Sequence, residues 1–363
     1  MVDILEDLEG DGQDADDTTT HAYLRHRRSV HFCYVAKVIR GMNVLSLFDG
    51  ISCARVALDR AGIEVNAYMS SEIDKNAIKI SEKNYSDIIR VGSVLDLEVE
   101  GQVDLLIGGS PCTDLSIAKK DRQGLEGNQS SLFWEYVRIK KECKPKWFIL
   151  ENVASMPKKD KDIITKEMGV EPVMFNASLV SAQSRKRLFW TNIPFDLPKD
   201  KGIVLKDILQ TSVDEKFYIN KAMKETGKTT GKVGYIGKGE QYGQGGQAHR
   251  VYAIDGKTPT LSSGAPLIQE ETRIRKLTPI ECERLQGLPD NYTEGVATTN
   301  RYKCLGNGFN CDVVAHILTA GCSPRSEHRG SGRSETPDGN RTGTVETLAC
   351  LGQACRSVGS MEV

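Results

Sequence analysis

Residues 43–50, Asn-Val-Leu-Ser-Leu-Phe-Asp-Gly, form a short apolar run that ends in an Asp-Gly turn. Such a run predicts a buried β-strand, and the helical pattern that follows it continues through Ala61 and is closed by Gly62. A strand, a turn and a helix in this order are the opening unit of a doubly wound sheet. The stretch therefore favours an α/β fold.

The alternation of strands and helices continues along the chain. Apolar runs predict strands at residues 65–70, 104–109 and 147–151, and helices at about residues 75–84 and 132–141. Strands that alternate with helices indicate a parallel sheet, and such sheets bind ligands at the carboxyl ends of their strands. We therefore expect a Rossmann-like doubly wound sheet with its functional residues at those ends.

The composition is that of an ordinary globular protein. The 363 residues are 39% hydrophobic and 27% charged, and the net charge is -1, so a nucleic-acid site would need local clusters of Lys and Arg. No apolar run approaches the length of a membrane span, and the acidic N-terminus is unlike a signal peptide. The ten cysteines lack the paired spacing of a zinc site, which predicts reduced thiols, no metal and a reducing compartment.

The chain divides into a patterned central part and two polar ends. Residues 1–41 and 321–363 lack apolar periodicity over most of their length, which predicts disordered tails. Residues 198–272 hold scattered Gly, Lys and Gln, and are either a flexible loop region or a small irregular β domain. Two later helices are expected at residues 275–285, where Thr278 and Pro279 form an N-cap pattern, and at residues 311–318.

Two acidic residues lie at the ends of the first two predicted strands. Asp49 and Gly50 occupy the first turn, and Glu72 follows about 20 residues later, where a carboxylate suits the hydroxyls of a ribose. The turn has one glycine rather than the full GxGxxG pattern. A plain turn followed by a surface glutamate therefore explains the same residues.

Three further groups of polar residues follow later strands. Cys112, after Gly108-Gly109-Ser110-Pro111, would be a nucleophile if its thiolate were stabilised, or else a small loop residue. Glu151, followed by Asn152, would be a general acid for a ring nitrogen, or a solvated loop residue. Arg185 and Arg187, after Gln183, would face one side of an extended strand, or form an exposed basic edge.

Taken together, a thiol, a carboxylic acid and an arginine pair at the edge of one sheet suit a particular reaction. A thiolate adds to carbon 6 of a pyrimidine while an acid acts at ring nitrogen 3, and carbon 5 then accepts a methyl group. The turn and Glu72 would hold a nucleoside cofactor beside them.

The chain resembles the cytosine-5 DNA methyltransferases over about residues 43–320, with the motifs in the family's order. The Gly-Gly-Ser-Pro-Cys segment is similar to the branch that includes animal de novo methyltransferases and their bacterial and phage relatives, and the short chain favours the bacterial or phage side. The matching motifs are Phe48-Asp49-Gly50, Glu72, Ser110-Pro111-Cys112, Glu151-Asn152-Val153, Gln183 with Arg185 and Arg187, the stretch from Arg275 to Pro289, and Gly306-Asn307-Gly308.

The resemblance implies a role for each matching residue. Cys112 would be the nucleophile, Glu151 would act at ring nitrogen 3, Arg187 would clamp the base, and Arg185 would support the cysteine loop and the target phosphate. The implied cofactor is S-adenosyl-L-methionine, without a metal, contacted by Phe48, Asp49, Gly50, Ile51, Glu72, Ser93, Pro111 and Asn307. The implied DNA contacts are Lys119, Lys120, Arg122, Gln183 and Thr260.

The resemblance also implies an organisation and partners. Residues 43–197, completed by residues 300–320, would bind the cofactor, residues 198–272 would recognise the target, and residues 273–299 would be a hinge segment. The expected partner is double-stranded DNA, with the target cytosine flipped out of the duplex. A cytoplasmic monomer is expected, with a cognate restriction endonuclease as a candidate partner.

Two departures keep alternatives open. The family usually has glycine at the position of Ala54 and aspartate, which commonly contacts the adenine, at the position of Ser93. A non-catalytic DNA-binding homologue would explain both changes. An RNA cytosine-5 methyltransferase is the other alternative, because one branch of the family methylates transfer RNA with the same catalytic set; residues 198–272 favour DNA.

Overall fold

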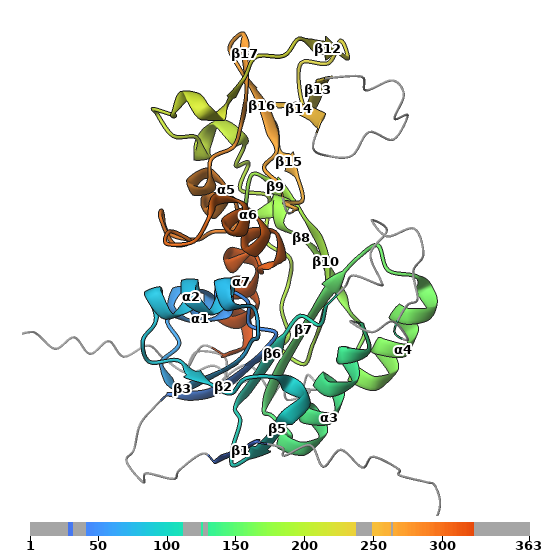
Figure 1. The fold of residues 1–363 in the computed structure, drawn as a ribbon. Coiled ribbons are helices and arrows are strands. Elements are labelled where there is room, and N and C mark those ends of the chain that lie inside the picture. Colours follow the sequence, from blue (N-terminus) through green and yellow to red (C-terminus); the bar gives the residue numbers. More distant parts are fainter. Residues whose placement is uncertain are drawn as a thin grey trace, which may run out of the picture. The chain divides into compact units, whose positions relative to one another are not determined.

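The computed structural model describes residues 28–31, 41–111, 125, 130–236, 249–262 and 264–322. Among these residues, the strands of a seven-stranded sheet lie between residues 42 and 191, and those of a six-stranded sheet lie between residues 218 and 276 (Figure 1). A two-stranded parallel pair joins β1 (Arg28–His31) to β5 (Leu97–Glu100), and a second joins β9 (Gln183–Ser184) to β15 (Thr258–Pro259). No helix among the described residues is long and apolar enough to cross a membrane.

The seven-stranded sheet has the order β4-β3-β2-β6-β7-β10-β8. The first five strands are mutually parallel, whereas β10 runs antiparallel to both of its neighbours. This confirms the α/β fold class, with a mixed rather than a purely parallel sheet. The strands are β2 (Met42–Leu47), β3 (Val65–Ser71), β4 (Ile89–Arg90), β6 (Leu105–Gly108), β7 (Trp147–Val153), β8 (Val173–Asn176) and β10 (Lys186–Thr191).

Helices cover both faces of this sheet because successive strand residues point to opposite sides. Val44 and Ile107 pack in the cluster that includes α1 and α7, whereas Leu45 and Leu106 pack in the cluster that includes α3 and α4. Figure 1 shows the two helical layers on either side of the strands. The helices are α1 (Cys53–Arg60), α2 (Lys75–Asn84), α3 (Phe133–Cys143), α4 (Lys158–Met168), α5 (Pro279–Leu285), α6 (Thr298–Asn307) and α7 (Cys311–Cys322).

The six-stranded sheet has the order β11-β17-β16-β14-β13-β12 and a small apolar core of its own. Of the two interpretations of residues 198–272, the described part therefore corresponds to an irregular β structure. The strands are β11 (Tyr218–Ile219), β12 (Met223–Glu225), β13 (Lys232–Ile236), β14 (Arg250–Ala253), β16 (Leu267–Glu270) and β17 (Arg273–Lys276).

The helix predicted at residues 275–285 begins later than expected. Arg275 lies in β17, fully buried, and its guanidinium binds Glu281 at 2.8 Å and Glu270 at 2.8 Å. The helix starts only at Pro279, where Thr278 and Glu281 form a reciprocal capping box. Arg275 also pairs in register with Tyr218 of β11 and Ile268 of β16, and this pairing within the sheet overrides the local helical pattern.

Candidate active site

The turn between β2 and α1 has an unusual backbone. Phe48, Gly50 and Ser52 have φ angles of 55°, 59° and 60°, in the left-handed region that glycine adopts freely and other residues rarely do. The Asp49 carboxylate is buried beneath the turn, and the Ile51 side chain is 1% exposed in the core. The predicted cofactor contacts of Asp49 and Ile51 can therefore come only from their backbone atoms.

Glu72, at the end of β3, lies against this turn. Its Oε2 accepts from the Gly50 N–H at 2.7 Å, and its Oε1 accepts from the N–H groups of Ile73 and Asp74, each at 2.7 Å. A carboxylate offers about four acceptor sites, so these three bonds leave capacity for a further donor such as a ribose hydroxyl. The adjacent Ile73 side chain is 72% exposed and offers an apolar surface. These residues fit a nucleoside cofactor.

The remaining predicted cofactor residues lie in three other segments. The half-buried Ser93 caps the 3-10 helix η1 (Val94–Asp96), where its hydroxyl accepts from the Leu95 N–H at 3.2 Å. Asn307 is exposed at the end of α6, next to Gly308, where an added Cβ would lie 2.9 Å from Cys53 Sγ at the start of α1. This close approach brings the Gly-Asn-Gly segment to the first turn. Pro111 is half-buried after β6.

The predicted nucleophile Cys112 lies outside the described residues, as do Lys119, Lys120 and Arg122. The segment that leads to Cys112 is nevertheless fixed. The Asn152 side-chain amide donates to the Ser110 carbonyl at 3.3 Å and to the Ser110 hydroxyl at 3.2 Å, and its own oxygen accepts from the Val153 N–H. Asn152 thereby ties the residue two positions before Cys112 to β7.

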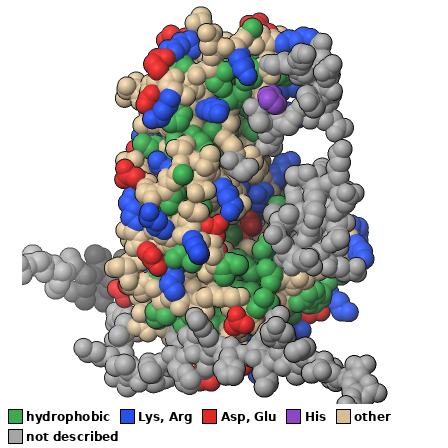
Figure 2. Space-filling model, in the orientation of Figure 1, with side chains coloured by type: hydrophobic (Ala, Val, Ile, Leu, Met, Phe, Trp, Pro, Cys, Tyr) green, Lys and Arg blue, Asp and Glu red, His purple; other side chains and the backbone are tan. Residues whose placement is uncertain are grey.

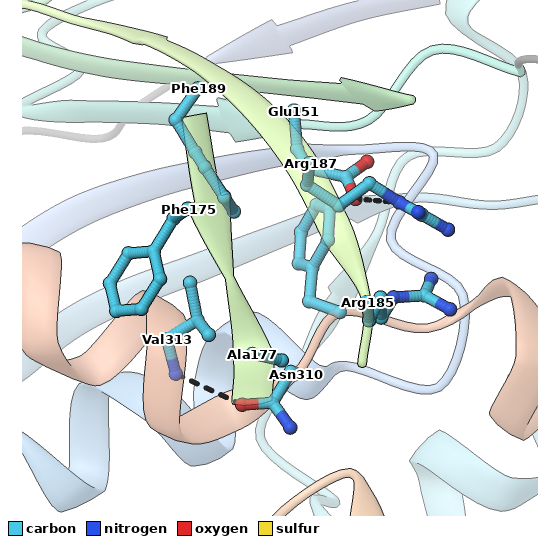
Figure 3. A pocket seen from close by; sticks show the side chains of 9 residues that line it. Glu151, Phe175, Ala177, Arg185, Arg187, Phe189, Asn310 and Val313 are labelled. Atoms are coloured by element: carbon cyan, nitrogen blue, oxygen red, sulfur yellow. Dashed lines mark hydrogen bonds and ion pairs between the residues drawn. The ribbon is translucent and has the colours of Figure 1, made fainter. Parts of the chain in front are cut away.

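Glu151 and Arg187 form an ion pair between neighbouring antiparallel strands. Arg187 Nε lies 2.8 Å from Glu151 Oε1, and the two side chains are 14% and 12% exposed. Both line a pocket (Figure 3), together with Phe175, Ala177, Arg185, Phe189, Phe309, Asn310 and Val313. A Cβ added to Gly109 would lie 3.2 Å from Glu151 Oε2, so the carboxylate packs against the backbone three residues before Cys112.

Arg185 lines the same pocket, as the predicted extended conformation required, but its guanidinium is held inside the protein. The residue is 3% exposed, and its Nη2 donates to the carbonyls of Gly306 and Gly308 at 3.2 and 3.0 Å. In this arrangement Arg185 positions the Gly-Asn-Gly segment. Its predicted contact with a DNA phosphate would require the side chain to move outward.

Gln183 is fully buried, and both ends of its amide are bonded within the protein. Its Oε1 accepts from the Leu261 N–H at 2.9 Å, and its Nε2 donates to Gln286 Oε1 at 3.2 Å. In this structure the Gln183 side chain is therefore not available for the predicted DNA contact. Thr260, the other predicted contact, is half-buried and donates its hydroxyl to the Ser184 carbonyl at 3.0 Å.

In the part of the chain that the structure describes, the remaining charged and thiol groups do not form a second site. On the face drawn in Figure 2, Lys and Arg side chains lie interspersed with Asp and Glu. No group of His, Cys, Asp and Glu among the described residues could hold a metal ion. Burial raises the thiol pKa of Cys143 and Cys304 to about 12, so these free cysteines stay protonated at neutral pH.

The sequence did not reveal several residues that shape the site. Tyr68, Ser70 and Arg90 surround Asp49. None of these three residues has a local signal, because each acts on a segment distant in sequence. Gln286, which belongs to the matched stretch from Arg275 to Pro289, donates to the Leu305 carbonyl at 2.6 Å beside the final motif. Asn310 lines the pocket, and its only signal in the sequence is its position two residues after the Gly-Asn-Gly motif.

Comparison with known proteins identifies the family. The model of the C-5 cytosine-specific DNA methylases matches residues 42–321. The chain is 29% identical to the type II methyltransferase M.HhaI of Haemophilus parahaemolyticus, over 77% of this chain and 94% of the relative. It is 30% identical to the type II methyltransferase M1.ScrFI of Lactococcus lactis subsp. cremoris, over 76% of each.

Solved structures agree on the fold. The methyltransferase EhMeth of Entamoeba histolytica aligns with a TM-score of 0.58 at 16% identity, over 77% of this chain and 97% of that one. A DNMT2 of Spodoptera frugiperda aligns with a TM-score of 0.57 at 16% identity, over 77% and 99%. The chain thus belongs to the C-5 cytosine-specific DNA methylase family, and is a DNA cytosine-5 methyltransferase.

Proposed function

We propose that this member of the C-5 cytosine-specific DNA methylases forms its covalent intermediate through Cys112, with Glu151 and Arg187 acting on the target base. The observation that carries the proposal is the packing of Glu151 against Gly109, at 3.2 Å from its added Cβ, while Asn152 fixes Ser110. A carboxyl group and the backbone leading to a thiol thereby share one sheet edge. Cys112 itself is assigned from the sequence motif.

In the first step the thiolate of Cys112 adds to carbon 6 of cytosine, forming an S–C bond, while ring nitrogen 3 takes a proton from the Glu151 carboxyl group. Arg187 stabilises the carboxylate that results and keeps it oriented, through the contact at 2.8 Å. Electron density then moves to carbon 5, which becomes the nucleophile for the methyl group.

S-adenosyl-L-methionine, when bound, supplies that methyl group. We propose that the backbone of Phe48 and Gly50, the Glu72 carboxylate and the exposed Ile73 hold its nucleoside, because these residues leave an acceptor and an apolar surface at the strand ends. In the final elimination a solvent water takes the carbon 5 proton, and the S–C bond breaks so that Cys112 leaves as thiolate and the C5–C6 double bond is restored. The proton on ring nitrogen 3 returns to Glu151.

Double-stranded DNA is the substrate proposed for this site. The target cytosine must leave the stack, because its ring atoms are otherwise shielded, at a cost of a few kcal/mol. We propose that residues 198–272 recognise the target, residues 273–299 act as a hinge segment, and residues 43–197 with 300–320 carry the catalysis. Lys119, Lys120 and Arg122 remain candidates for phosphate contacts.

The biological setting is inferred from relatives. The names of the relatives include type II methyltransferases and an orphan methyltransferase of Bacillus phage SPR, M.SPRI, which is 27% identical. Both a restriction–modification role, with a cognate endonuclease, and a solitary role are compatible with these names. We propose a cytoplasmic monomer.

Covalent trapping tests the proposal. Duplex DNA that contains 5-fluorocytosine within its target sequence should form an adduct at Cys112 in the presence of the cofactor, because fluorine at carbon 5 blocks the final elimination. The target sequence is first found by bisulfite sequencing of DNA from a methylation-deficient host that expresses the protein. Absence of an adduct on a mapped target would contradict the mechanism, and labelling of transfer RNA alone in a parallel assay would overturn the DNA substrate.

A further inference from the structure

The first turn is held in a conformation that its own residues disfavour. Ser52 has a φ of 60° and a ψ of 37°, in the left-handed region, directly before α1. A non-glycine residue adopts this conformation at a cost in free energy and keeps it only where the surroundings impose it. Side-chain contacts must therefore hold Ser52 in place.

Asp49 provides part of the support. Its side chain is 0% exposed, and its Oδ1 accepts from the hydroxyls of Ser46 and Tyr68, each at 2.6 Å. Its Oδ2 accepts from the hydroxyls of Ser52 at 2.6 Å and Ser70 at 2.8 Å. The acceptor capacity of the carboxylate is thus filled by protein donors. Burial and the Asp49 charge raise the pKa of Tyr68, which keeps the phenol protonated as a donor.

Arg90, at the end of β4, provides the other part. Its Nη1 lies 4.0 Å from Asp49 Oδ2 and donates to the Ser70 hydroxyl at 2.9 Å. Its Nη2 donates to the Ser81 hydroxyl at 2.6 Å, and Ser81 in turn contacts the Ser52 hydroxyl. Arginine can only donate hydrogen bonds, so each serine hydroxyl is left to donate onward. Two chains of hydroxyls therefore run from Arg90 to Asp49, one of them through Ser52.

We propose that Arg90 and Asp49 are positioning residues for the cofactor: through Ser70, Ser81 and Ser52 they fix the first turn in its left-handed conformation before the cofactor binds. The inference rests on the proposed cofactor site, because the Gly50 N–H that faces Glu72 belongs to this turn. Arg90 and Asp49 thereby contribute to cofactor binding, although their side chains do not contact the cofactor.

A glycine at position 52 separates this role from a general loss of stability. Glycine adopts the left-handed region without the cost that serine bears, so Ser52→Gly removes the need for the network. If Arg90 and Asp49 act by holding Ser52, their loss should be repaired by Ser52→Gly. If they only stabilise the core, Ser52→Gly should repair nothing.

The experiment measures the dissociation constant of S-adenosylhomocysteine by calorimetry on the full chain without DNA. We expect Arg90→Met and Asp49→Asn to weaken binding about tenfold, as the conformational cost implies. Ser52→Gly alone should change the constant less than about twofold, and each double variant with Ser52→Gly should recover most of the loss. Arg284→Met, which removes a guanidinium that binds Asp290 and backbone carbonyls elsewhere, is the matched control and should leave the constant unchanged.

Ser81→Ala decides the matter if Asp49→Asn does not fold. It breaks only the chain from Arg90 to Ser52, and should weaken binding a few-fold and be repaired by Ser52→Gly. Unchanged binding in the single variants, or doubles as weak as the singles, would overturn the inference. If the variants give such results while the wild-type protein methylates DNA, the inference fails and the proposed function stands. If the wild-type protein neither binds S-adenosylhomocysteine nor methylates DNA, the proposed function itself fails.

Discussion

Two carboxylates at the same sheet edge have opposite environments. Asp49 is fully buried and accepts four hydroxyl hydrogen bonds, whereas Glu151 is 12% exposed, pairs with Arg187 and lines a pocket. The first is saturated by the protein and shapes a turn. The second keeps an oxygen beside the backbone that leads to Cys112. Both stand at strand ends, so the difference lies in their hydrogen-bond partners: a saturated carboxylate supports structure, and an accessible one is available for chemistry.

The largest effect is expected at the nucleophile. Cys112→Ser should lower methyl transfer by on the order of 10⁴-fold or more, because the hydroxyl is a far weaker nucleophile than a thiolate. Methyl transfer from labelled cofactor to duplex DNA measures the loss, and cofactor binding without DNA is the control. Substantial residual transfer would contradict the covalent mechanism.

Glu151→Gln sharpens the contrast between the two carboxylates directly. An amide cannot deliver the proton to ring nitrogen 3, so we expect the turnover number to fall about 10²- to 10⁴-fold. Single-turnover methylation kinetics measures this, with thermal unfolding as the control for folding. If Glu151→Gln weakened cofactor binding as Asp49→Asn does while turnover stayed normal, the two carboxylates would have to be assigned the same role.

Arg187→Lys should have a smaller effect. Lysine keeps the positive charge but loses the planar fork that fixes the Glu151 carboxylate, and we expect turnover to fall about 10- to 100-fold. The measurement is the same single-turnover assay. Equal losses in Arg187→Lys and Arg187→Met would mean that orientation, not charge, is what Arg187 contributes; no loss in either would remove it from the site.

Gln183→Met tests a residue that the sequence assigned to DNA. Because both ends of the buried amide are bonded, to Leu261 and Gln286, its loss should destabilise the protein by about 1–3 kcal/mol. Urea unfolding measures this cost. DNA affinity at a fixed salt concentration should not change, since no DNA contact is removed. Normal stability together with weaker DNA binding would restore the DNA contact.

The smallest effect concerns Asp74, which caps α2 and binds Lys303 of α6 at 2.8 Å. The hydrogen bond from Lys303 lowers the carboxyl pKa, so the stabilisation is present above the unfolded pKa of about 3.9 and is lost as the pH falls through the lower folded value. Asp74→Asn should cost less than about 1 kcal/mol at pH 7, because the pair is partly exposed. In acid unfolding curves, the difference in unfolding free energy between the wild-type protein and Asp74→Asn should disappear as the pH falls below about 4.

Features that depend on neighbouring residues could be predicted from the sequence. The strand before the Asp49-Gly50 turn, which forms β2, and the helix at residues 75–84, which forms α2, follow from local periodicity. The order of the motifs follows from their spacing. The same motif order identified the family, which the comparisons confirm. Periodicity is enough here because strands that are buried on both faces need apolar residues throughout.

The identity of the buried polar groups, in contrast, depends on contacts made in the folded protein. Asp49, Arg185 and Gln183 belong to matched motifs, yet the structure turns their side chains inward to hydroxyls, carbonyls and an amide from distant segments. Arg275 likewise joins a strand because it pairs in register with Tyr218 of β11, 57 residues earlier in the chain, and with Ile268 of β16. A buried polar group must find hydrogen-bond partners. In this chain, folding brings some of these partners together from segments more than 100 residues apart. No local sequence pattern can reveal such partners.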